Sequence, residues 1–167
     1  MKTFVTVGLE RKPFSRLLKF VDHAVQCNVL SPDTLVQCGH TNFPAHSFKT
    51  VDFLPFASMV AAIEDAELVI THAGVGSILL CLNAGKIPLV VPREGRLGEH
   101  VDNHQVEFAE VMAAAGKVKT AYNEEDFFLL LHQAEQWHSK LSPISNQDLE
   151  LELVNSLNTL LKEHSKP

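Results

Sequence analysis

The amino-acid sequence predicts an α/β protein: a Rossmann-like parallel sheet of about six strands with helices on both faces. Short runs of β-branched and apolar residues alternate with segments whose apolar residues recur at helical spacing. Glycines follow the ends of several runs, and most runs are separated by enough residues for the crossover helices that join parallel strands.

Each expected strand is a short apolar run that ends at a turn-forming or polar residue. The six runs are Thr3–Val7, Thr34–Cys38, Phe48–Phe53, Glu67–Thr71, Ile87–Pro92 and Lys117–Ala121. The expected helices span residues 14–25, 58–66, 77–85, 104–116 and 123–137. Asn123 is expected to cap the last helix, because its side chain can accept a hydrogen bond from the first helical turn.

Composition indicates an ordinary globular protein, with 46% hydrophobic and 20% charged residues in a chain of 167. The formal net charge of −6 argues against a broad basic surface for nucleic acid or anionic lipid. Cys27, Cys38 and Cys81 form no C-x-x-C pair, which favours free thiols in a reducing compartment over a disulfide framework or a zinc site. Since the sequence also shows no signal peptide and no apolar run of membrane-spanning length, we expect a cytoplasmic protein.

Residues 1–140 are expected to form the folded domain, and residues 141–167 a linker followed by an amphipathic helix. The leucines that mark one face of this helix include Leu149, Leu153, Leu157 and Leu160. These leucines would either dock a partner or pack against the protein's own sheet, and the sequence leaves both possibilities open.

The segment "THAGVGS" (71–77) places two glycines between an expected strand and an expected helix. Gly74 and Gly76 would let the first N–H groups of that helix face a diphosphate, beside His72. A tight turn without any ligand accounts for the same glycines. The segment is neither a P-loop nor a G-x-G-x-x-G fingerprint, since no Lys-Ser/Thr follows and Leu79 stands where the third glycine would be.

A second segment, "VPREGRLGEHVDNHQVEF" (91–108), gathers polar side chains in one expected loop before a helix. The residues that could hold an anion or a sugar hydroxyl are Arg93, Arg96, His100, Asn103, His104 and Gln105. A structural explanation is also open, in which Asp102 and Gln105 form a capping box and the two arginines are solvated surface charges.

Two further candidates lie where expected parallel strands end, which is the edge at which such sheets bind ligands. Gly8 could allow a close backbone approach after the first strand, although a simple turn explains it equally well. Leu54 follows the third strand, where its backbone could pair with the edge of a base. An apolar packing corner is the alternative for Leu54.

Two stretches resemble the donor-binding domain of the GT-B glycosyltransferases of family 28: "AELVITHAGVGSILLCLNAGKIPLVVP" and "GEHVDNHQVEFAEVMAAAGKV". The resemblance covers Thr3–Lys119. A GT-B enzyme normally has a second, acceptor-binding domain, so the chain resembles the separate donor subunits of split enzymes. It looks most similar to the bacterial capsule and exopolysaccharide E-type subunits, and is related to the catalytic subunit of the dolichol-pathway N-acetylglucosaminyltransferase.

The resemblance implies the UDP-sugar-binding subunit of an inverting enzyme that transfers a hexosyl group to a lipid-linked acceptor in surface polysaccharide synthesis. It implies no metal and no further cofactor. We expect the catalytic base to lie in a membrane-anchored acceptor-binding subunit, which would recruit this chain to the inner face of the membrane. The contacts implied are Gly74, Val75, Gly76 and Ser77 at the diphosphate, Leu54 at the uracil, His100, Asn103, His104 and Gln105 at the sugar and phosphate, and Arg93 or His100 at the leaving group.

Leu80 departs from the family pattern, in which many members have a glutamate that binds the ribose hydroxyls. This departure favours an alternative function, a non-catalytic nucleotide-binding regulatory module of the same fold. A Rossmann-type oxidoreductase is a further alternative, which the missing third glycine and the missing ribose-binding acid disfavour. The sequence leaves galactose, glucose, glucuronic acid and N-acetylglucosamine open as the transferred sugar.

Deletion of residues 145–167 tests whether the leucines near the C-terminus dock a partner. If they do, the shortened chain stays folded by circular dichroism but no longer co-purifies with the membrane-anchored subunit. A complex that survives the deletion would rule out this docking role.

Overall fold

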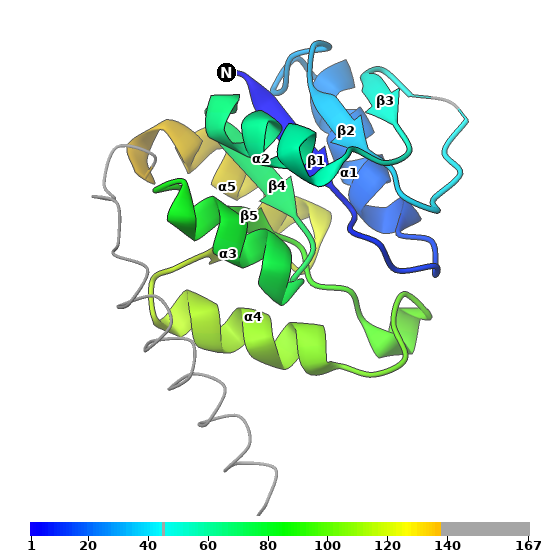
Figure 1. Ribbon diagram of the computed structural model, residues 1–167, viewed down its shortest axis with the longest axis vertical. Helices are drawn as coiled ribbons and strands as arrows, with labels where there is room; N and C mark the ends of the chain where they lie inside the picture. Colours follow the sequence, from blue (N-terminus) through cyan, green and yellow to red (C-terminus); the bar gives the residue numbers. More distant parts are fainter. Residues whose placement is uncertain (45, 138–167) are drawn as a thin grey trace, which may run out of the picture.

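The computed structural model describes residues 1–44 and 46–137, in which a six-stranded parallel sheet carries helices on both faces (Figure 1). The strands are β1 (Thr3–Thr6), β2 (Leu35–Gln37), β3 (Lys49–Val51), β4 (Leu68–Thr71), β5 (Leu89–Val90) and β6 (Lys119–Thr120). The helices are α1 (Ser15–Gln26), α2 (Phe56–Asp65), α3 (Val75–Asn83), α4 (His104–Ala114), α5 (Glu124–Trp137) and the short 3-10 helix η1 (Gly95–Leu97). The strand order β3-β2-β1-β4-β5-β6, with every pair parallel, confirms the predicted fold class.

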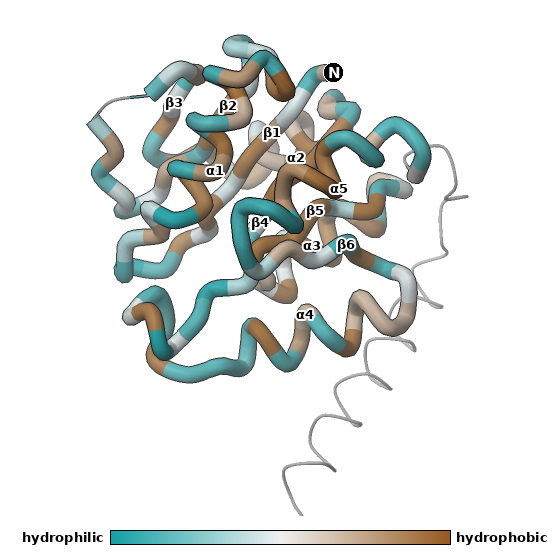
Figure 2. Tube along the Cα trace, turned by 180° about the vertical axis from the view of Figure 1, so that it is seen from behind, coloured by the Kyte–Doolittle hydropathy of each residue, from teal (hydrophilic) through white to brown (hydrophobic). Residues whose placement is uncertain are grey.

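The central strands are buried on both faces, which is why they read as nearly continuous apolar runs in the sequence. Successive side chains of a strand point to opposite faces. Phe4 and Val69 therefore pack in a cluster with residues of α2 and α3, whereas Val5 and Ile70 pack in a cluster with residues of α1 and α5. Figure 2 shows the hydrophobic residues concentrated along these strands and the hydrophilic ones in the surrounding loops.

A third cluster joins α4 to α3 and places the start of α4 beside the sheet edge where the strands end. Ile78 and Leu82 of α3 pack there with Phe108 and Met112 of α4. The loop between β5 and α4, which carries most of the polar candidates, is therefore anchored at its far end by apolar packing.

Element boundaries differ from the sequence prediction by a few residues. Helix α2 begins at Phe56, two residues before the expected start, because Met59 N–H already donates to the carbonyl oxygen of Pro55. Asn123 caps α5 as predicted, since its Oδ1 accepts a hydrogen bond of 2.9 Å from Asp126 N–H. The expected C-terminal leucine helix lies outside the described residues.

The described residues, 1–44 and 46–137, include no helix that is both long enough and apolar enough to cross a membrane.

A buried arginine ties together the loops at the carboxyl ends of the strands. The side chain of Arg93 is fully buried, and its guanidinium donates hydrogen bonds of 2.8–3.1 Å to the carbonyl oxygens of Val7, Lys12 and Glu99. Its Cζ atom lies 4.5 Å from the centre of the Phe14 ring. Burial lowers the pKa of Arg93 to about 10, against which Glu10 and Glu99 favour the charged form, so the side chain stays charged at neutral pH.

A second arginine fixes the same loop to α1. Arg16 forms a two-pronged ion pair with Glu99, with Nε 2.9 Å from Oε1 and one terminal nitrogen 2.8 Å from Oε2. The same guanidinium donates to the carbonyl oxygens of Pro92 and Tyr122. Paired donors of this geometry give directional as well as electrostatic stabilisation, so the loop from Pro92 to Glu99 is held in one position.

Replacing Arg93 should destabilise the fold, because Arg93→Ala leaves three buried or partly buried carbonyl groups without their donor. We expect the free energy of unfolding to fall by about 3 kcal/mol, measured by urea denaturation. Arg96→Ala is the matched control, since 76% of the Arg96 side chain is exposed and we expect a much smaller change. Equal effects of the two substitutions would contradict the structural role of Arg93.

Candidate functional site

The functional candidates gather where β1 and β4 lie side by side. The chain leaves β1 through α1 toward one edge of the sheet and leaves β4 through α3 toward the other, and ligands of open parallel sheets bind at such a switch point. A cavity of about 910 Å³ opens there. The predicted residues that line it are Gly8, Leu54, His72, Gly74, Gly76, Ser77, His100 and Gln105.

His72 lines this cavity, and the space taken by its ring explains why two of the neighbouring residues are glycines. A Cβ atom at Gly8 would lie 2.4 Å from His72 Cε1, and a Cβ atom at Gly74 would lie 2.2 Å from His72 Nε2. Both distances are too short for any side chain. Gly8 also has a φ of +78°, which disfavours other residues. A side chain at either position would therefore force the His72 ring to move, whether or not a ligand is present.

Gly76 behaves differently. Apart from its chain neighbours and the backbone of its own helix, no atom lies within 4 Å of a Cβ built at this position, so no packing contact in the described fold demands a glycine. Gly76 lies in the first turn of α3, where Ile78 N–H makes the first hydrogen bond of the helix, to Gly74. No side chain of the described residues caps this helix, so its first N–H groups and the positive end of its dipole are available to an anion.

A chain of polar contacts under the cavity joins β1, β2 and the loop before α2. Gln37 donates to Thr6 Oγ1 at 3.0 Å and accepts from Leu54 N–H at 2.9 Å, while Thr6 Oγ1 also accepts from Gly8 N–H. The Leu54 amide is thus already paired, and any backbone contact of Leu54 with a base would have to use its carbonyl group. Gln37 lines the cavity but was not among the predicted residues, since its one signal in the sequence is a polar residue inside an apolar strand.

At the polar rim of the cavity, His100 lies between two carboxylates, of which Glu10 also lines the cavity. His100 Nδ1 lies 2.9 Å from Asp102 Oδ1, and His100 Nε2 lies 3.8 Å from Glu10 Oε2. Backbone hydrogen bonds, mainly from Lys12 N–H, lower the pKa of Glu10. A backbone hydrogen bond from His104 N–H and the neighbouring histidines lower the pKa of Asp102. Glu10 lines the cavity but was not among the predicted residues.

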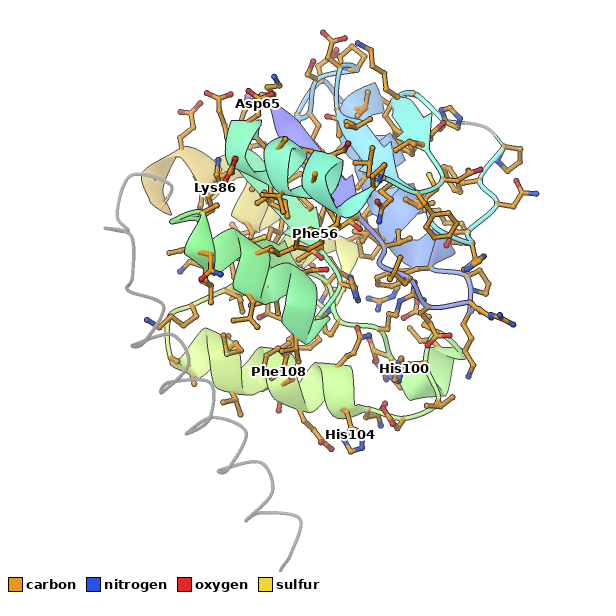
Figure 3. The ribbon with its side chains drawn as sticks, in the orientation of Figure 1. Phe56, Asp65, Lys86, His100, His104 and Phe108 are labelled. Carbon is orange, nitrogen blue, oxygen red and sulfur yellow. The ribbon has the colours of Figure 1, made fainter. Side chains whose placement is uncertain are left out.

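Four predicted residues do not line the cavity. Arg93 is fully buried and donates to backbone carbonyl groups, and its expected contact with a leaving group stays a prediction. Asn103 accepts a hydrogen bond from Gly95 N–H. Val75 is the first residue of α3, and its side chain is exposed. His104 projects outward at the start of α4, whereas His100 lies on the preceding loop (Figure 3).

The capping box that the sequence left open as a structural alternative at the start of α4 does not form. Gln105 instead accepts a hydrogen bond of 3.2 Å from Arg93 N–H, and Asp102 accepts one from His104 N–H. Gln105 therefore connects the end of β5 to the start of α4 at the edge of the cavity.

Burial of His72 should make the stability of the fold depend on pH. Burial, and to a lesser degree the charge of Arg93, lowers the pKa of His72 from 6.5 to about 4. Between these two values the unfolded chain binds a proton that the folded chain rejects, so the free energy of unfolding falls as the pH falls through this window. We expect a loss of about 2 kcal/mol between pH 7.5 and pH 5 in urea denaturation.

His72→Gln should remove this part of the pH dependence, and His132→Gln, at an exposed site on α5, should retain it. Carboxylates contribute little above pH 5, because their unfolded pKa values lie below it. The assignment fails if His72→Gln and the unchanged chain lose the same stability over this range.

Two curated relatives are UDP-N-acetylglucosamine transferase subunits ALG13. The one from Candida albicans is 48% identical over 48 residues, and the one from Yarrowia lipolytica is 51% identical over 45 residues. These alignments cover 29% and 27% of this chain, and only 15% and 21% of the two relatives.

Two solved structures share the fold. A solution structure of ALG13 superposes with a TM-score of 0.63 at 22% identity, covering 91% of this chain and 94% of that one. The glycotransferase of kitacinnamycin superposes with a TM-score of 0.57 at 17% identity, covering 93% of this chain and 38% of that one. The model of the glycosyltransferase family 28 C-terminal domain matches residues 3–163. The chain therefore belongs to glycosyltransferase family 28, through the C-terminal domain of that family.

Proposed function

We propose that this chain is the UDP-sugar-binding subunit of a two-component inverting glycosyltransferase. The observation that carries the proposal is the cavity at the switch point between β1 and β4, one wall of which is the open first turn of α3. Membership of family 28 and the relation to ALG13, a UDP-N-acetylglucosamine transferase subunit by name, support it.

The diphosphate of the donor is proposed to lie against the first turn of α3. The N–H groups of Val75, Gly76 and Ser77 and the helix dipole would bind its charge, as at other helix N-termini. His72, with its pKa near 4, is neutral at pH 7 and can offer a hydrogen bond but no charge. His100 at the rim of the cavity faces the sugar and phosphate side in this arrangement.

The proposed reaction is an in-line displacement at the anomeric carbon. The acceptor hydroxyl oxygen forms the new bond to this carbon, the bond to the UDP oxygen breaks, and the hydroxyl proton passes to a base. We place that base in the partner subunit. The α3 N–H groups would then stabilise the negative charge that develops on the departing UDP, in a site without a bound metal.

The finer parts of the proposal concern the partner and the pathway. We propose a membrane-anchored acceptor-binding subunit, a lipid-linked acceptor on the cytoplasmic side of the membrane, and surface polysaccharide synthesis of the bacterial E-type. The names of the two relatives support N-acetylglucosamine as the first sugar to test among the hexoses.

A second candidate function is a non-catalytic nucleotide-binding module, and one observation favours it. Leu80 lines the cavity on the face of α3 where many family members carry a ribose-binding glutamate. A donor held more weakly would suit a regulatory role. Co-expression with a neighbouring membrane-anchored subunit separates the two functions, because only the glycosyltransferase gains transfer activity from the partner.

Titration of the isotope-labelled chain with UDP, ADP and NAD tests the proposed donor. We expect UDP alone to shift the amide NMR signals of residues 74–77 and 100–105, and EDTA to leave this response unchanged. No response to UDP, or an equal response to ADP, would refute the UDP-sugar function while leaving the fold intact.

Substitution of single glycines distinguishes a glycine that the fold requires from one that ligand binding requires, because stability and UDP affinity are measured separately. Gly76→Ala should preserve the free energy of unfolding, or raise it by up to about 1 kcal/mol, because alanine favours a helix over glycine. The same methyl group should weaken UDP binding by about tenfold or more, measured by calorimetry, since it enters the proposed diphosphate site.

Gly74→Ala is the matched control, because its methyl group would collide with His72 and destabilise the fold. If Gly76→Ala binds UDP like the unchanged chain, the diphosphate does not lie against the first turn of α3.

A further inference from the structure

The cavity has a polar end at the start of α3 and an apolar end between α2 and α3. Leu54, Met59 and Leu80 line the apolar end, and all three pack against one buried cluster that lies beneath these helices. Gly76, Leu80 and Asn83 lie three or four residues apart and form one face of α3, which spans about 10 Å along the cavity. The wall therefore changes from exposed backbone to aliphatic side chains along its length.

An exposed aromatic ring stands at this apolar end. Phe56 is the first residue of α2, lines the cavity, and is 68% exposed. Figure 3 shows its side chain between α2 and α3. None of the ring–ring or cation–π contacts found among the described residues involves Phe56.

The neighbouring Phe53 provides a contrast within the same short segment. Phe53 is 42% exposed, but its ring lies against the His40 ring, with the centroids 4.9 Å apart. It lines a separate cavity of about 380 Å³ beyond β2 and β3. The two phenylalanines of "DFLPF" thus serve different surfaces, and only Phe56 faces the cavity at the switch point.

We propose that Phe56 is the residue on which the nucleobase of the donor stacks. A nucleobase offers a flat π-face, and stacking on an aromatic side chain stabilises it in a way that an aliphatic wall cannot. With the diphosphate at the start of α3, the base falls at the apolar end, over Leu54, Met59 and Leu80. This inference rests on the proposed UDP-sugar function and adds to it the residue that determines affinity for the nucleoside.

Calorimetric titration of the full chain with UDP and with inorganic pyrophosphate tests the role of Phe56. Phe56→Ala and Phe56→Leu should bind UDP about 5- to 100-fold more weakly than the unchanged chain. Phe56→Tyr, which keeps an aromatic face, should bind within about twofold. Because pyrophosphate has no base to stack, its binding should be the same in all of these variants.

Phe53→Ala is the matched control and should bind UDP like the unchanged chain. Circular dichroism checks that each variant is folded. We expect the Phe56 variants to fold because this side chain is 68% exposed. If UDP binds the unchanged chain and Phe56→Ala equally well, the stacking role is wrong while the proposed function stands. If the unchanged chain does not bind UDP at all, both are wrong.

Discussion

The positions of the loops at the carboxyl ends of the strands depend on one buried guanidinium group. Arg93 follows β5, yet its side chain bonds to carbonyl groups after β1, at the entry to α1 and in the loop before α4. The Phe14 ring packs against it, and the ion pair of Arg16 with Glu99 holds the same loop from α1. An arginine with five donors can bridge three carbonyl groups, which a single ammonium group cannot do in the same geometry. These contacts bring Gly8, on the loop after β1, and the loop of His100 to the same cavity.

The glycines around this cavity differ in whether the fold itself requires a residue without a side chain. Gly8 and Gly74 leave space for the His72 ring, so a tight, ligand-free turn explains them fully. Gly76 has empty space beside it and no positive φ, so the fold does not need a glycine there. A ligand-free turn therefore accounts for Gly74 of "THAGVGS", whereas the fold gives no reason for Gly76, which is the glycine that supports the proposed diphosphate site.

The cavity wall along α3 is polar at one end and apolar at the other. Backbone N–H groups and Ser77 lie at one end, where an anion is stabilised by the helix dipole. Leu80, Met59 and Phe56 lie at the other, where apolar contact dominates. This gradient matches a nucleoside diphosphate, which is charged at one end and flat and weakly polar at the other. Leu80 strengthens the apolar end at the expense of hydrogen bonding.

The sequence by itself determined the fold class and the order of the strands along the chain, and eight of its twelve predicted site residues line the cavity. These follow from local rules: alternation of side chains in strands, helical spacing, and the binding of ligands at the carboxyl ends of parallel strands. Only the tertiary structure decided what individual polar side chains do. Arg93 turns inward and donates to backbone carbonyl groups, Gln37 takes the Leu54 amide, and Glu10 joins the rim beside His100. Such contacts join residues up to about 90 positions apart, and side-chain direction over such separations is set by packing, which no local pattern in the chain records.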